Sequence, residues 1–109
     1  MTQGATYRLK GFRASLAVRG REMTASTGEN VKAIVEKREA LPDPTGEAQA
    51  KLPVFSVIHV EAGLVADPRA VTSFAETQEG GRGYTVLWFD EDASDEVKHA
   101  WVCEAQRKP

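Results

Sequence analysis

Six short segments rich in apolar residues follow one another along most of this chain, and turn-forming residues separate them. Segments of this length, bounded by glycine, proline or acidic turns, are typical of strands in small antiparallel sandwiches and barrels. The sequence therefore predicts a mainly β fold, a small antiparallel β-barrel or sandwich of about six strands. The predicted strands are residues 21–27, 31–37, 54–60, 70–77, 84–89 and 98–105.

The residues before the first predicted strand follow a helical pattern instead. Leu9, Phe12 and Leu16 recur at a spacing that places them on one stripe of a helix. Arg19 and Gly20 come next, and a cation in the last turn followed by a glycine at the C′ position is typical of the C-terminal end of a helix. We expect a short amphipathic helix over residues 6–19. A hairpin turning just before Gly20 is the alternative, but the middle of this segment lacks the β-branched residues that favour strands.

The segment 38–52 interrupts the series of strands. It holds Pro42, Pro44 and Gly46 within five residues, which excludes a continuous helix or strand. We therefore expect one long loop inside a single domain that spans residues 1–109, with a barrel over 21–105 and a polar tail at its end. A chain of 109 residues is long enough for one such domain and too short for two ordinary ones.

Two interpretations of this long loop remain open. As a plain linker it would be tolerated, because added loop length costs little entropy. As a functional arm it would order against a partner, with Leu41 as an apolar anchor and the two prolines limiting the entropy lost. The candidate partner-contact residues are Arg38, Leu41, Pro42, Asp43, Pro44 and Lys51.

Charge and composition narrow the class of partner and the compartment. The net charge is −2, and no run of five or more basic residues occurs, so specific nucleic-acid binding is not expected. The N-terminus has no apolar signal core, and the longest apolar stretch is interrupted by Ser56 and His59, so no membrane span is expected. The single cysteine, Cys103, allows no intrachain disulfide. We expect an intracellular protein, or one that is assembled inside a cell.

Two segments resemble ligand-binding loops and are better explained as turns. The acidic segment 90–96 carries alternating oxygen ligands, but an EF-hand needs glycine at its sixth position and glutamate at its twelfth, where this chain has Asp95 and Trp101. The glycine cluster 80–83 leads into a strand, whereas phosphate-binding loops open a helix. Solvated connections between strands account for both.

No set of residues predicts catalysis, a cofactor or a metal site. His59, His99 and Cys103 are the only soft ligands, and alternate residues of one strand do not make a tetrahedral zinc site. No serine or cysteine lies in a pattern that pairs a nucleophile with a base. We expect Trp101 and Cys103 in the core, His99 near its edge, and Trp88 in the core as well.

The order of these elements resembles that of the head–tail joining proteins of tailed bacteriophages, which act as head completion, connector or stopper proteins of the neck. The motifs are a helix of the form Phe12-x-x-x-Leu16-x-x-Arg19-Gly20 before the first strand, a barrel with one long loop, and Gly83-Tyr84-Thr-Val opening a late strand. The resemblance covers about residues 9–107.

This resemblance implies a structural virion protein without enzymatic activity. Such a protein is assembled in the host bacterial cytoplasm, forms a ring with heterologous subunit contacts, joins the portal or its adaptor to tail proteins, and helps to retain packaged DNA. Tail terminator and minor tail proteins use similar barrels and are one alternative. A cellular SH3-like or OB-like module that binds a peptide or single-stranded nucleic acid is another.

Overall fold

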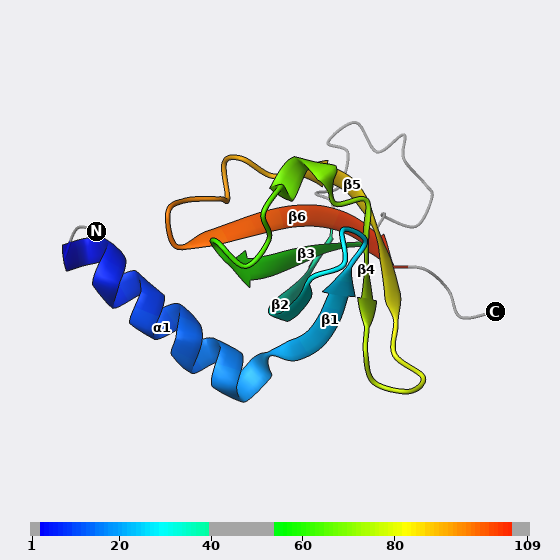
Figure 1. Cartoon of the computed structure of the whole chain (residues 1–109), viewed down its shortest axis with the longest axis horizontal. Coiled ribbons are helices and arrows are strands. Elements are labelled where there is room, and N and C mark those ends of the chain that lie inside the picture. The colour runs from blue at the N-terminus through cyan, green and yellow to red at the C-terminus, as the bar shows by residue number, and fades with distance from the viewer. Residues whose placement is uncertain (1–2, 40–53, 106–109) are drawn as a thin grey trace.

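The computed structural model describes residues 3–39 and 54–105, which form one helix and a six-stranded barrel (Figure 1). The helix lies outside the barrel and leads into its first strand. The elements are α1 (Gln3–Arg19), β1 (Arg21–Ala25), β2 (Asn30–Glu39), β3 (Val54–Glu61), a 3₁₀ helix η1 (Pro68–Ala70), β4 (Ser73–Glu76), β5 (Gly83–Phe89) and β6 (Lys98–Ala105).

The six strands close into a barrel in the order β1-β2-β3-β6-β5-β4. Every neighbouring pair is antiparallel, and β4 pairs with β1 to complete the circle. The predicted mainly β class, the antiparallel barrel and the N-terminal helix are confirmed. Closure removes the exposed sheet edges that an open sandwich of the same strands would leave.

The largest differences from the predicted strand boundaries lie in β1, in β4 and at the end of β2, and other strand ends shift by one residue. β1 ends at Ala25, where the chain turns through Gly28 at a φ of 105°. β4 is only four residues long, because Ala70 belongs to η1 and the next two residues lie outside the strand ladder. β2 continues to Glu39, which pairs with Val54, so Arg38 lies in a strand and not in the predicted loop. The cross-strand ladder to β3 extends the strand beyond its most apolar part.

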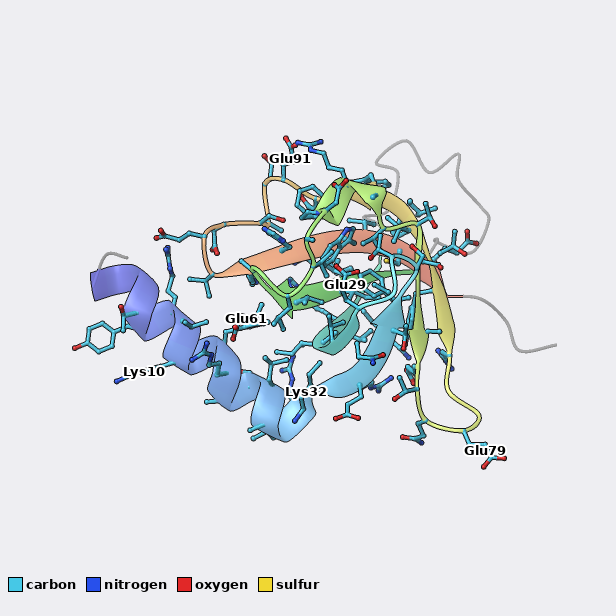
Figure 2. The ribbon with its side chains drawn as sticks, viewed as in Figure 1. Lys10, Glu29, Lys32, Glu61, Glu79 and Glu91 are labelled. Carbon is cyan, nitrogen blue, oxygen red and sulfur yellow. The ribbon has the colours of Figure 1, made fainter. Side chains whose placement is uncertain are left out.

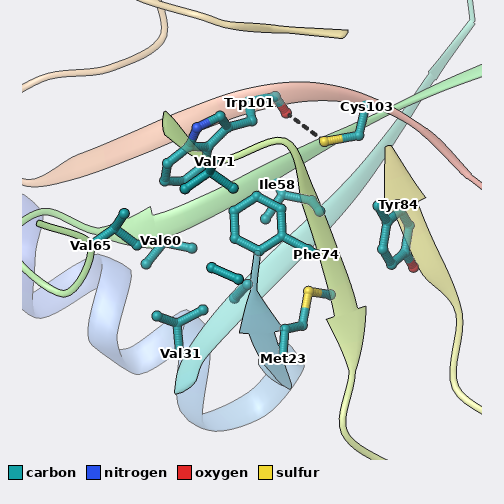
Figure 3. Close-up of a cluster of buried hydrophobic side chains, with 12 residues drawn as sticks. Met23, Val31, Ile58, Val60, Val65, Val71, Phe74, Tyr84, Trp101 and Cys103 are labelled. Carbon is teal, nitrogen blue, oxygen red and sulfur yellow. Dashed lines mark hydrogen bonds between the residues drawn. The ribbon is translucent and has the colours of Figure 1, made fainter. Parts of the chain in front are cut away.

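The barrel interior is filled by inward-facing residues from all six strands (Figure 3). The rings of Phe74 and Trp101 meet edge to face, with their centroids 5.0 Å apart. The indole Nε1–H of Trp101 donates a hydrogen bond of 2.8 Å to the Pro68 carbonyl, so its polar atom is satisfied. The predicted placement of Trp101 and Cys103 in the core, and of His99 near its edge, is confirmed.

The prediction for Trp88 is wrong. Val86 pairs with Cys103 and Trp88 pairs with Val102, so Leu87 is the extra residue of a β-bulge. A bulge reverses the inward and outward alternation beyond it. Trp88 therefore faces outward and is 53% exposed, whereas the next residue, Phe89, packs against the core beside Trp101.

Helix α1 contacts the outside of the barrel along the predicted apolar stripe. Leu16 is buried, and Leu9 and Phe12 are half-buried. Arg13 Nε donates to Glu61 Oε1 at 2.6 Å, across the gap between the helix and the end of β3, where Figure 2 labels Glu61. A second ion pair, of 3.2 Å, joins Arg8 to Glu96. The helix is longer than predicted by three residues at its start.

Gly20 makes the turn from α1 into β1, but not as a left-handed cap. Its N–H donates a 2.8 Å hydrogen bond to the Leu16 carbonyl, and it is not among the described glycines with positive φ. The constraint is space, since a Cβ at this position would lie 2.4 Å from that carbonyl oxygen. The glycine was predicted for the right place and the wrong reason.

We expect Gly20→Ala to destabilise the fold by about 2 kcal/mol, because the turn must shift to relieve the clash. The matched control is Gly11→Ala in α1, where a Cβ meets nothing within 4 Å. This control should gain about 0.5–1 kcal/mol from higher helix propensity. Urea unfolding measures both, and equal stability of the Gly20 variant and the parent would contradict the packing argument.

Candidate functional site

The outer surface of β3, β5 and β6 carries apolar side chains that the barrel interior does not use. Val57, Ala100 and Val102 are buried there, with Phe55 and Ala93 packed against them. This second cluster lies on the opposite side of the sheet from the main core, since its residues alternate with the inward-facing ones. The segment that contains Ala93 covers part of the cluster, and Ser94 fixes it by accepting a 2.9 Å hydrogen bond from the Ala100 N–H.

Part of this outer surface is left exposed. The rings of Phe55 and Trp88 lie 6.4 Å apart, and Leu87 is exposed next to Trp88 in the chain. We call Phe55, Leu87 and Trp88 the outer patch. Large apolar residues grouped on a surface are typical of sites that bind proteins or peptides, and tryptophan is enriched where binding energy concentrates.

One predicted contact residue borders the outer patch. Arg38 lies directly opposite Phe55 in the β2–β3 register, and its guanidinium pairs with Glu36 at 3.2 Å. The structure thus brings Arg38 next to an aromatic pair. The remaining predicted contact residues, Leu41, Pro42, Asp43, Pro44 and Lys51, lie outside the described residues. Sequence reasoning missed the outer patch because the bulge at Leu87 has no glycine or other marker in the sequence.

A polar chain crosses the same outer surface from β2 to β6. His59 is buried between Glu36, whose Oε2 lies 3.1 Å from its Nε2, and Lys98, whose Nζ lies 3.1 Å from its Nδ1. An ammonium can only donate, so Nδ1 accepts and Nε2 carries the proton. The neutral imidazole satisfies both neighbours, and protonation would set a second N–H against the Lys98 ammonium.

Burial first, and then the charge of Lys98, lower the pKa of His59, while Glu36 opposes them. The folded pKa lies below the ordinary value of 6.5, so between these two values the unfolded chain binds more protons. Stability therefore falls as the pH is lowered through 6.5. Burial lowers the pKa of His99 also, so the two histidines act in the same direction.

We expect Lys98→Met to raise the pKa of His59 and to weaken the loss of stability between about pH 7 and about pH 5. The reason is removal of the ammonium that opposes a second proton. NMR titration of the His59 ring protons measures the pKa, and urea unfolding at several pH values measures stability. His99 is the internal control, and a His59 pKa that stayed in place would contradict the assigned tautomer.

Cys103 has no access to solvent, and its Sγ approaches the Trp101 carbonyl at 3.7 Å (Figure 3). Burial raises the pKa of this thiol to about 12, so the reactive thiolate is almost absent near neutral pH.

We expect a thiol reagent to modify Cys103 in the folded protein at least about 100-fold more slowly than in the protein unfolded by denaturant. Equal rates under the two conditions would show that the core opens readily at β6.

The acidic segment 90–96 and the glycine cluster 80–83, which resemble ligand-binding loops in sequence, form turns in the structure. Asp95 Oδ1 accepts hydrogen bonds from the Val97 and Lys98 N–H groups, at 2.7 and 3.1 Å, so a backbone turn uses this oxygen. The glycine cluster joins β4 to β5, with Gly80 at a φ of 75°. Within residues 3–39 and 54–105, no group of three or more His, Cys, Asp or Glu residues could hold a metal ion.

No helix in the described part of the chain is long and apolar enough to cross a membrane.

The outer patch, bordered by Arg38 and the Glu36–His59–Lys98 chain, is suited to binding an apolar or aromatic group beside a charged one. Comparison with known proteins finds no family model, no curated protein and no solved structure that matches this chain.

Proposed function

We propose that this chain is a structural virion protein of the tailed-bacteriophage neck, which assembles as a ring and joins the portal to the tail. The observation that carries the proposal is the outer patch, where Trp88 is 53% exposed beside Phe55. The order of helix and barrel, and the motifs that resemble those of head–tail joining proteins, support the choice of this family. Retention of packaged DNA belongs to the same role.

A ring needs two different contact surfaces on each subunit, because its contacts are heterologous. The outer patch is one candidate surface. The other is the free face of α1, where Tyr7 and Val18 are 65% and 84% exposed on the side opposite the stripe that packs on the barrel. The helix and β5 lie on different sides of the barrel (Figure 1), as head-to-tail contacts require.

The outer patch also favours a second candidate function, a cellular binding module of SH3-like or OB-like shape. Aromatic side chains on a small barrel can bind a proline-rich peptide or stack on bases. A tail terminator or minor tail protein would use the same surfaces as the neck protein at another position in the virion. The partners that the protein retains distinguish these roles.

We expect tagged protein to retain portal and tail proteins from a lysate of phage-producing cells, as identified by mass spectrometry. Trp88→Ser should weaken this retention at least about tenfold, because it removes an aromatic contact residue. Trp88→Phe should keep most of it. The control is Leu64→Ser, which removes another exposed apolar side chain, 44% accessible, from the segment between β3 and β4.

Circular dichroism confirms that each variant is folded before the retained proteins are compared. Retention of cellular proteins or oligonucleotides alone would replace the neck role with the binding module. Equal loss in the Trp88 and Leu64 variants would remove the outer patch from the proposal. Fractionation of disassembled particles into heads and tails separates a neck position from a tail position.

A further inference from the structure

The inward-facing positions of the barrel turn from apolar to polar at one end. Arg21 follows the inward face of Met23 and Ala25 in β1, and Lys37 follows that of Val35 in β2. Ser56, Glu76 and Tyr84 hold the corresponding places in β3, β4 and β5. Five strands thus direct polar groups toward one mouth of the barrel, although solvent is available on the outer side of each strand.

Four of these residues, Arg21, Lys37, Ser56 and Tyr84, line a cavity of about 410 Å³ together with Val35. Its lining residues include three basic ones, Arg21, Lys37 and Arg82, which come from three separate segments. The backbone holds Arg82 in place, because its carbonyl accepts a 2.9 Å hydrogen bond from the Glu76 N–H. Three cations that converge on one hollow repel one another unless an anion lies between them.

One carboxylate contacts this group of cations. Glu76 Oε2 accepts from Arg21 at 3.2 Å and from the Tyr84 hydroxyl at 3.1 Å. In the described part of the chain, Lys37 and Arg82 have no such ion pair. The described cations therefore outnumber the contacting carboxylate by two, the charge of a phosphate dianion.

The hydroxyl of Ser56 is a further donor in the cavity. Ser56 is only 5% exposed and lines the cavity directly across the ladder from Lys37. No hydrogen bond joins this hydroxyl to another described residue, and it is not among the fully buried polar atoms, so it can donate into the cavity. An oxyanion in the cavity would accept from it and from the neighbouring cations together.

We propose that this barrel mouth, formed by Arg21, Lys37, Ser56 and Arg82, binds an oxyanion of the phosphate class. A tetrahedral anion can accept from donors in several directions, as three cations and a hydroxyl around one cavity require, whereas a carboxylate is satisfied by a single arginine. The site is separate from the outer patch and does not depend on the neck role. Its phosphate source is free phosphate or a phosphate monoester.

The test is a backbone NMR titration with inorganic phosphate at constant ionic strength, with chloride as the balancing anion. We expect saturable shifts at the barrel mouth, with a dissociation constant on the order of millimolar. The double variant Lys37→Gln/Arg82→Gln should weaken binding at least about tenfold. The control double variant, Lys10→Gln/Arg19→Gln, removes the same charge from the exposed surface of α1 and should bind as the parent does.

Repeating the titration with glycerol phosphate separates the two sources, since a site open only to free phosphate would exclude the ester. Shifts that grew linearly without saturation would overturn the proposal. Equal weakening in both double variants would overturn it too, because binding would then follow net charge and not the cavity. Ser56→Ala, which leaves every charge in place, should weaken binding severalfold and tests the hydroxyl by itself.

Discussion

The pairing of β4 with β1 is the contact on which the rest of this structure depends. It closes six short strands into a barrel, so each strand has one face that is inside by geometry. Met23 and Phe74, from the two closing strands, pack together in the core with residues of the other four. Because β4 is only four residues long, the seam rests on few backbone hydrogen bonds and on this shared core.

Closure also decides where polar groups gather. Inward-facing positions are buried near the middle of the barrel and reach solvent at its ends. Lys37 and Arg21 are therefore tolerated on the inward face, two residues along the strand from the apolar Val35 and Met23. The same strands present different chemistry outside. There the buried imidazole of His59 joins Glu36 to Lys98, and apolar side chains form a second, smaller cluster.

The helix is attached to this barrel by a limited set of contacts. One side of α1 packs through Leu16, and ion pairs at Arg8 and Arg13 hold it along its length. Exposed ion pairs contribute little each, so burial of the apolar stripe accounts for most of the attachment. Gly20 sets the angle at which the helix leaves the barrel, because only glycine fits beside the Leu16 carbonyl.

The sequence by itself determined the fold class, the helix and the approximate course of each strand, because period-2 and helical patterns of apolar residues are local properties. The last strand, Lys98–Ala105, was predicted to the residue. Tertiary structure decided what depends on partners distant in the chain. Pairing with β3 kept Arg38 in a strand, the bulge at Leu87 turned Trp88 outward, and closure gathered Arg21, Lys37 and Arg82 at one mouth. None of these follows from local pattern, since register and closure are set between strands.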